Sequence, residues 1–162
     1  MTHEEAIEKL RDLMKSTKLC MLTTMTEDGQ HVSRPMGVQE TEFGGDVWFF
    51  TYEDSNKVRQ VRHNPQVNVA FSNEDKHTWV SLSGAAEVVH DRNKAEELWN
   101  PFLKAWFPDG LETEGLTLLK VKAESAEYWD SPIGKGLALF GTIKAAVTGK
   151  PPESGENKTI SL

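Results

Sequence analysis

Short strand-like segments separated by turn residues run through most of this sequence, and they constrain its fold more than any other feature. Residues 19–25 and 31–38 flank Glu27-Asp28-Gly29, a turn signature that joins antiparallel strands. Further strand-like runs cover residues 47–52, 67–71, 79–89 and 116–129. Gly84 interrupts one of these runs and predicts a β-bulge or a barrel corner. The pattern predicts a closed or sandwich-like antiparallel sheet.

Helical segments are fewer, and they do not alternate strictly with strands as they would in a doubly wound fold. Thr2 and Glu5 have capping-box spacing, and apolar residues then recur at helical period up to Ser16. We expect three further helices: from Asp54 or Ser55 to Arg62, from Asp91 to about Ala105, and around residues 137–147 with a stop at Gly149. The predicted fold class is therefore mainly β (α+β), with helices at the ends of the sheet.

The composition limits the classes of partner. A chain of 162 residues is long enough for one domain, which we place at residues 1–149, followed by a flexible C-terminal tail at 150–162. A net charge of −7 argues against sequence-independent binding to nucleic acid, which depends on basic side chains. Cys20 is the only cysteine, and no apolar run approaches the ~18–20 residues of a membrane span. We expect a cytoplasmic protein with no membrane or nucleic-acid partner.

Arg34 is the first candidate for a binding role. Strand alternation over residues 31–38 places it on the same face as Val32, Met36 and Val38. A half-buried guanidinium is costly unless it meets an anion, and its forked geometry suits phosphate or carboxylate. From the residues alone, an internal salt bridge or an exposed arginine is the favoured explanation.

The segment Thr51 to Lys57 is the second candidate, because a strand ends and a helix begins there. Free backbone N–H groups and the helix dipole favour an anion at such a junction, with Ser55 as hydroxyl donor and Lys57 as counter-charge. The alternative is a surface helix capped by Ser55, with Lys57 in solvent.

Aromatic residues at 48–50, 52, 79 and 129 could flank a flat heterocycle or could simply be core. The five histidines have no metal-ligand spacing, so no metal site is predicted. Gly134-Lys-Gly136 lacks the rest of a P-loop, and no serine lies in a nucleophile-elbow motif. Phosphoryl transfer and triad hydrolysis therefore find no support.

The ordered set of motifs resembles the pyridoxamine 5'-phosphate oxidase-like family of FMN-binding split β-barrels, in its general-stress branch. The matching motifs are Ser33-Arg-Pro-Met36, Trp48-Phe-Phe-Thr51, Ser55-Asn-Lys-Val58, Asn64-Pro65, the run 80–89 with Asp91-Arg92, and Glu127-Tyr-Trp129. The resemblance implies an antiparallel split β-barrel with peripheral helices, FMN as cofactor and a homodimer.

It also implies roles for individual residues. Arg34 and Lys57 would hold the FMN phosphate, with Thr51, Ser55 and Asn56 beside it. The backbone of Pro35, Met36, Gly37 and Val38 would pass along the isoalloxazine ring, and Phe50 would lie close to the ring. Trp79 and Trp129 would approach the flavin from the partner subunit.

The chain departs from the true pyridoxamine 5'-phosphate oxidases in two respects. It has no Arg after Arg92 and no His after His90, whereas those oxidases use a C-terminal Arg and His pair on their substrate, so that activity is not expected. Asn56-Lys57 replaces their Arg-Lys pair, which removes one phosphate-binding charge. The resemblance leaves three functions open: an FMN-dependent oxidoreductase with an unknown redox partner, a non-enzymatic flavin-binding stress protein, and a barrel that has exchanged flavin for another ligand.

Overall fold

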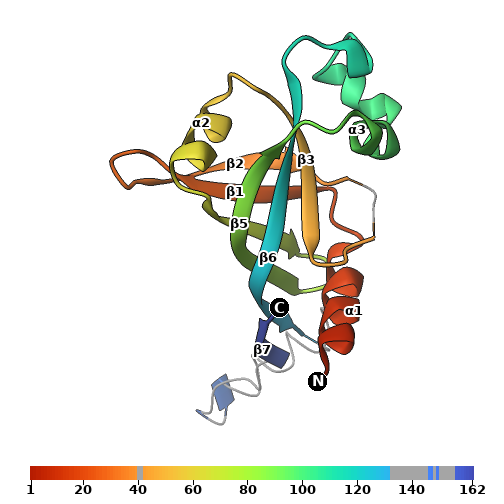
Figure 1. Ribbon diagram of the computed structural model, residues 1–162. Helices are drawn as coiled ribbons and strands as arrows, with labels where there is room; N and C mark the ends of the chain where they lie inside the picture. The colour runs from red at the N-terminus through yellow and green to blue at the C-terminus, as the bar shows by residue number, and fades with distance from the viewer. Residues whose placement is uncertain (40–41, 132–145, 148, 150–155) are drawn as a thin grey trace.

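The computed structural model describes residues 1–39, 42–131, 146–147, 149 and 156–162. Figure 1 shows its helices and strands, which alternate irregularly along the chain. The helices are α1 (His3–Met14), α2 (Asn56–His63) and α3 (Arg92–Leu98), with short 3-10 helices η1 (Pro101–Ala105) and η2 (Gly110–Glu112). The strands are β1 (Leu19–Met25), β2 (His31–Gly37), β3 (Asp46–Tyr52), β4 (Gln66–Asn73), β5 (Thr78–Val89), β6 (Leu116–Asp130) and β7 (Glu156–Ser161).

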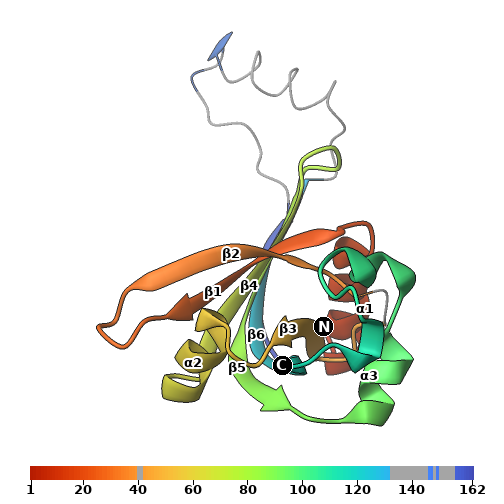
Figure 2. The same ribbon diagram turned by 90° about the horizontal axis from the view of Figure 1, so that it is seen from above.

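All strand pairs are antiparallel, in the order β2-β1-β4-β5-β6-β3. Strand β6 connects the two ends of the fold, because it pairs with β5 along its length and with β3 and then β7 on its other edge. Figures 1 and 2 show the sheet curling around its interior, and Figure 1 shows α2 and α3 near one end and α1 near the other. The predicted class, a mainly β split barrel with peripheral helices, is confirmed.

The core lies between the curved sheet and helix α1. Thr2 caps this helix in the predicted capping box, and its apolar face buries Ala6, Ile7, Leu10 and Met14. Alternate strand residues point into the same core, because side chains on a strand alternate between its two faces. The fully buried members include Leu22, Phe49, Val69, Leu82, Leu119, Val121 and Tyr128.

Gly84 produces the predicted bulge in β5. The register between β5 and β6 shifts between Ser83 and Gly84. A Cβ atom on Gly84 would lie 2.0 Å from the carbonyl oxygen of Lys122, so only glycine fits where the two strands approach each other.

Two expectations need correction. The helix expected from Asp91 to Ala105 ends at Leu98, and Pro101 starts the separate 3-10 helix η1, because proline lacks the N–H that would continue an α-helix. The expected tail at 150–162 contains strand β7, which pairs with Ser125–Asp130 of β6. The six residues of β7 carry little strand signal of their own. They form a strand because the edge of β6 offers hydrogen-bonding partners. Of the helix expected around residues 137–147, residues 137–145 lie outside the described residues, and 146–147 are helical.

No helix within the described part of the chain is long and apolar enough to span a membrane.

Candidate anion-binding cavity

Arg34 lies on the half-buried face of β2, as strand alternation predicts. Its Nη1 donates to the carbonyl oxygen of Leu22 at 3.3 Å and to Thr24 Oγ1 at 2.7 Å, and its Nη2 donates to Gln60 Oε1 at 3.1 Å. These three acceptors are neutral, so they orient the guanidinium without cancelling its charge. Burial lowers the pKa of Arg34, because desolvation disfavours its charged form.

Thr51, Ser55 and Lys57 meet where β3 leads into α2. Lys57 Nζ donates to Thr51 Oγ1 at 3.1 Å, and Thr51 Oγ1 lies 3.2 Å from Ser55 Oγ. Ser55 is the N-cap residue of α2, but its side chain makes no capping hydrogen bond. Its hydroxyl instead lies beside that of Thr51, so the local-capping alternative does not describe its side chain.

Lys57 and Arg34 form one positively charged site. Burial lowers the pKa of Lys57, and the nearby charge of Arg34 lowers it further. Both effects disfavour the protonated amine when no anion is present. An anion placed between the two groups would reverse the second effect, so these residues fit a phosphate or carboxylate.

The two cations open onto a cavity of about 240 Å³. Its walls come from β2, from the end of β3 and from η1 with the residues that follow it. Among the described residues that line it, the charged side chains are Arg34 and Lys57. The full lining set is Arg34, Pro35, Met36, Gly37, Gln39, Phe50, Thr51, Tyr52, Lys57, Leu103, Trp106 and Phe107.

Aromatic side chains of β3 and of the segment after η1 line this cavity together with residues of β2. The ring of Tyr52 lies 4.9 Å from that of Phe107 between centroids, and Phe50 lies 6.3 Å from Phe107. The hydroxyl of Tyr52 donates to the carbonyl oxygen of Trp106 at 2.6 Å, which ties the chain after η1 to β3. A flat ring can pack against such a surface.

The structure brings together most of the residues implicated by sequence. Seven of them line the cavity, and Ser55 joins them through Thr51: Arg34, Pro35, Met36, Gly37, Phe50, Thr51 and Lys57. Val38 packs instead against the core, and Asn56 is exposed and accepts a hydrogen bond from Arg59.

Trp79 and Trp129 are not part of this cavity within one chain. They face each other across β5 and β6, and they are 40% and 38% exposed. Strand β6 reaches the cavity region at its start, near Leu116, whereas Trp129 is close to its other end.

Sequence analysis missed Gln39, Leu103, Trp106 and Phe107 as cavity residues. Gln39 follows β2, and the other three belong to a segment about fifty residues further along the chain than the end of β3. Leu103 falls within the helix expected from Asp91 to about Ala105, and no local pattern links that segment to β2 or β3.

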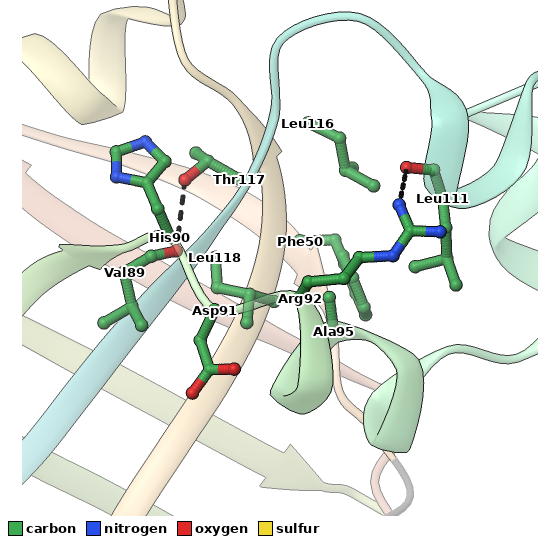
Figure 3. Close-up of a pocket in the computed structure, with 10 residues that line it drawn as sticks. All are labelled: Phe50, Val89, His90, Asp91, Arg92, Ala95, Leu111, Leu116, Thr117 and Leu118. Carbon is green, nitrogen blue, oxygen red and sulfur yellow. Dashed lines mark hydrogen bonds between the residues drawn. The ribbon is translucent and has the colours of Figure 1, made fainter.

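A second cavity, of about 270 Å³, lies on the α3 side of Phe50, which lines both cavities. Figure 3 shows its apolar floor and the Arg92 side chain, which turns toward Leu111. Arg92 donates to the Leu111 carbonyl oxygen at 3.0 Å and pairs with Glu112 at 2.6 Å, so its charge is already compensated. The second cavity is consequently a weaker anion site than the first. In the described residues, no cluster of three or more His, Cys, Asp or Glu side chains could hold a metal ion.

Comparison with known proteins identifies a family that matches this chain. The family model described as pyridoxamine 5'-phosphate oxidase like matches residues 5–153. Protein bli-3 of Neurospora crassa is 32% identical over 171 residues, which cover 98% of this chain and 80% of the relative.

Two solved structures extend the comparison. The general stress FMN/FAD binding protein from Xanthomonas citri is 32% identical, with a TM-score of 0.69 over 81% of this chain and 92% of that one. A Jannaschia sp. CCS1 protein assigned as general stress protein 26 is 25% identical, with a TM-score of 0.78 over 98% and 99% of the two chains. The chain belongs to the pyridoxamine 5'-phosphate oxidase-like family, and its fold is that of the general stress proteins within it.

Proposed function

We propose that this protein binds FMN in the cavity between β2 and η1, at the interface of a homodimer. The observation that carries the proposal is the pair of half-buried cations, Arg34 and Lys57, whose contacts are with neutral acceptors. The printed function of the Xanthomonas citri relative, FMN/FAD binding, supports a flavin as the ligand.

Each part of the cavity has a role in this proposal. Arg34 and Lys57 hold the terminal phosphate, and the hydroxyls of Thr51 and Ser55 lie close enough to donate to it. The backbone from Pro35 to Val38 passes along the isoalloxazine ring, with Phe50 close to it. Asn56 contributes no charge, and its exposed position is consistent with moderate flavin affinity.

A second copy of the chain completes the site in this proposal. Trp79 and Trp129 are exposed aromatic side chains on neighbouring strands, remote from their own chain's cavity. We assign them to the flavin of the partner subunit. Trp79→Ser together with Trp129→Ser should weaken both FMN binding and dimerisation; a wild-type mass of one chain in light scattering would refute this arrangement.

We favour an FMN-dependent oxidoreductase. Bound FMN would supply hydride or electron transfer, while the protein binds the cofactor, orients it and limits the access of water to it. Pyridoxamine 5'-phosphate oxidase activity is not proposed, because the Arg and His pair expected for it is missing from the sequence after residue 92.

The alternative is a non-enzymatic flavin-binding stress protein, in which the same cavity holds FMN without turnover. Steady-state oxidation of NADH or NADPH with an artificial acceptor would favour the enzyme. A flavin that can be reduced but shows no turnover with either donor would favour the binding protein.

The first experiment is a visible absorption spectrum of the purified protein after FMN addition and gel filtration. A retained two-banded flavin spectrum, at about one FMN per chain, is the expected result. A colourless protein after reconstitution would refute flavin binding at this cavity.

The phosphate assignment needs its own test, in which Arg34→Ala is titrated with FMN and with riboflavin, which lacks the phosphate. Loss of a charge-assisted contact worth ~1.5–3 kcal/mol should weaken FMN by roughly tenfold or more. Riboflavin affinity should change little. Arg62→Ala, an exposed arginine on α2, is the matched control. Equal losses for both ligands would mean that Arg34 acts through the fold and not through the phosphate.

A further inference from the structure

Large apolar side chains on the surface of this protein gather in two groups. Among the described residues, eight large hydrophobic side chains are exposed, and six of them belong to these groups. Exposed apolar residues that lie together mark interaction sites, whereas single ones are ordinary. Each group is therefore a candidate contact surface. The outer-sheet group is Leu19, Met21, Trp79 and Trp129, and the η1 group is Phe102 and Trp106.

Strand pairing places the outer-sheet group on one face of the sheet. Trp79 and Trp129 are direct neighbours on β5 and β6. Met21 of β1 pairs with Ala70 of β4, and Ala70 pairs with Ser81 of β5. Ser81 follows Trp79 by two residues and so shares its face, because side chains on a strand alternate. The group therefore forms one apolar surface on the outside of the sheet.

The η1 group lies at the rim of the anion-binding cavity. Trp106 lines this cavity and is nevertheless 65% exposed, and Phe102 is 85% exposed. The residues next to them, Leu103 and Phe107, are buried and attach the segment to the fold. The hydrogen bond from the Tyr52 hydroxyl to the carbonyl oxygen of Trp106 holds it against β3. The fold thus presents two aromatic side chains to solvent from a fixed position.

One chain cannot bring its two groups together. Figure 1 shows α3 and the segment that follows it at one end of the fold, and β7 at the other end. Trp129 pairs with Asn157 of β7, so the outer-sheet tryptophans belong to that second end. Two copies of the chain can join the groups, and in a dimer with twofold symmetry such a contact forms twice.

The charges beside the two groups are complementary. Lys104 lies between Phe102 and Trp106 on η1 and is exposed. Glu127 lies two residues before Trp129 and hence on the same face of β6. Contact between the two groups brings an ammonium group toward a carboxylate, whereas contact of either group with its own counterpart brings like charges together. Electrostatic complementarity therefore favours the mixed contact.

We propose that the η1 group is the surface on which the partner subunit's Trp79 and Trp129 dock. Phe102 and Trp106 of one copy and the two tryptophans of the other then close the mouth of the cavity together. The proposal rests on the proposed function, which assigns these tryptophans to the flavin of the other subunit, and it names the surface that receives them. Since residues of both chains close each cavity, FMN binding and dimerisation strengthen each other.

Two double variants test this pairing. Phe102→Ser with Trp106→Ser removes the η1 group, and Trp79→Ser with Trp129→Ser removes the aromatic part of the outer-sheet group. A dimer of either variant has no intact contact, so its dissociation constant should rise by more than about tenfold. Val147→Ser, at an exposed apolar residue outside both groups, is the control and should dimerise as the wild type does.

An equimolar mixture of the two variants is the decisive sample. A mixed dimer regains one intact contact, because the outer-sheet group of the first variant meets the η1 group of the second. Light scattering should therefore show dimers in the mixture at concentrations where each variant alone is a single chain. The mixed dimer should retain about one FMN per two chains, since one of its two cavities is closed as in the wild type.

The proposal is overturned if the variant without Phe102 and Trp106 dimerises as tightly as the wild type, or if two folded variants stay single chains when mixed. If either variant does not fold, charge reversal decides: Lys104→Glu should weaken the dimer, and adding Glu127→Lys to the same chain should restore it. A double reversal as weak as the single one would overturn the contact. Dimer mass without FMN tests the contact, whereas FMN retention by the wild type tests the proposed function, so the two failures are distinguishable.

Discussion

Lys57→Met should change two quantities in opposite directions. The flavin-free protein should keep or gain stability, whereas its affinity for FMN should fall. In the flavin-free protein, burial and the charge of Arg34 lower the pKa of Lys57. Removing the amine relieves both effects. The flavin-free variant should therefore be as stable as the wild type or more stable, by less than about 1 kcal/mol after solvent screening.

Binding should change by more than stability. Loss of one charge-assisted contact with the phosphate costs about 1.5–3 kcal/mol, which weakens FMN by roughly 10- to 150-fold. At an FMN concentration of about 100 times the wild-type Kd, the ligand stabilises the wild type by about 2.7 kcal/mol, and a tenfold loss of affinity leaves about 1.4 kcal/mol. For a chain of 162 residues, the FMN-induced rise in Tm should fall from roughly 5–11 °C to roughly 3–6 °C.

Thermal unfolding with and without FMN measures both quantities on one sample. Lys122→Met is the matched control, because Lys122 is an exposed lysine on β6 outside the cavity lining. The control should keep the full FMN-induced shift. A Lys57→Met protein that is clearly less stable without FMN, yet keeps the wild-type shift, would show that Lys57 supports the fold and does not bind the phosphate.

Two further substitutions test the frame around the site. Gly84→Ala places a Cβ against the Lys122 carbonyl oxygen and should lower the free energy of unfolding by about 1–3 kcal/mol, as measured by urea denaturation. The pKa of Glu53 is lowered because Arg62 and, after it, His90 donate hydrogen bonds to the carboxylate. The stabilising effect of Glu53 is therefore present above the ordinary glutamate pKa of 4.5, and it is lost as the pH falls through the lowered pKa of the folded state. The stability difference between wild type and Glu53→Gln should accordingly shrink below pH 4.5; a difference that stays constant down to the most acidic pH tested would contradict this.

Sequence patterns predicted the parts of the site that local geometry determines. Alternation along β2 placed Arg34 on the half-buried face, and the junction of β3 with α2 placed Thr51, Ser55 and Lys57 together. Both predictions depend only on residues close in sequence, where strand and helix periods define the direction of each side chain.

The missed residues depend on contacts between distant segments. Gln39 shares the cavity lining with Leu103 and Phe107, which lie more than sixty residues further along the chain. Strand β7 was missed for a similar reason, since six mainly polar residues form a strand because β6 offers them an edge. No pattern within either segment carries that information.

The contacts of Arg34 explain how a cationic site can be rigid and still free to bind. Its three protein hydrogen bonds use three of the five guanidinium donors, so among the described residues they leave Nε–H and one Nη2 hydrogen for an anion. A carboxylate would orient the group equally well but would compete with the ligand for its charge. Neutral acceptors avoid that competition, at the cost of two poorly compensated cations in the flavin-free protein. Binding of a phosphate removes this cost, so part of the affinity comes from strain that the protein carries before the ligand arrives.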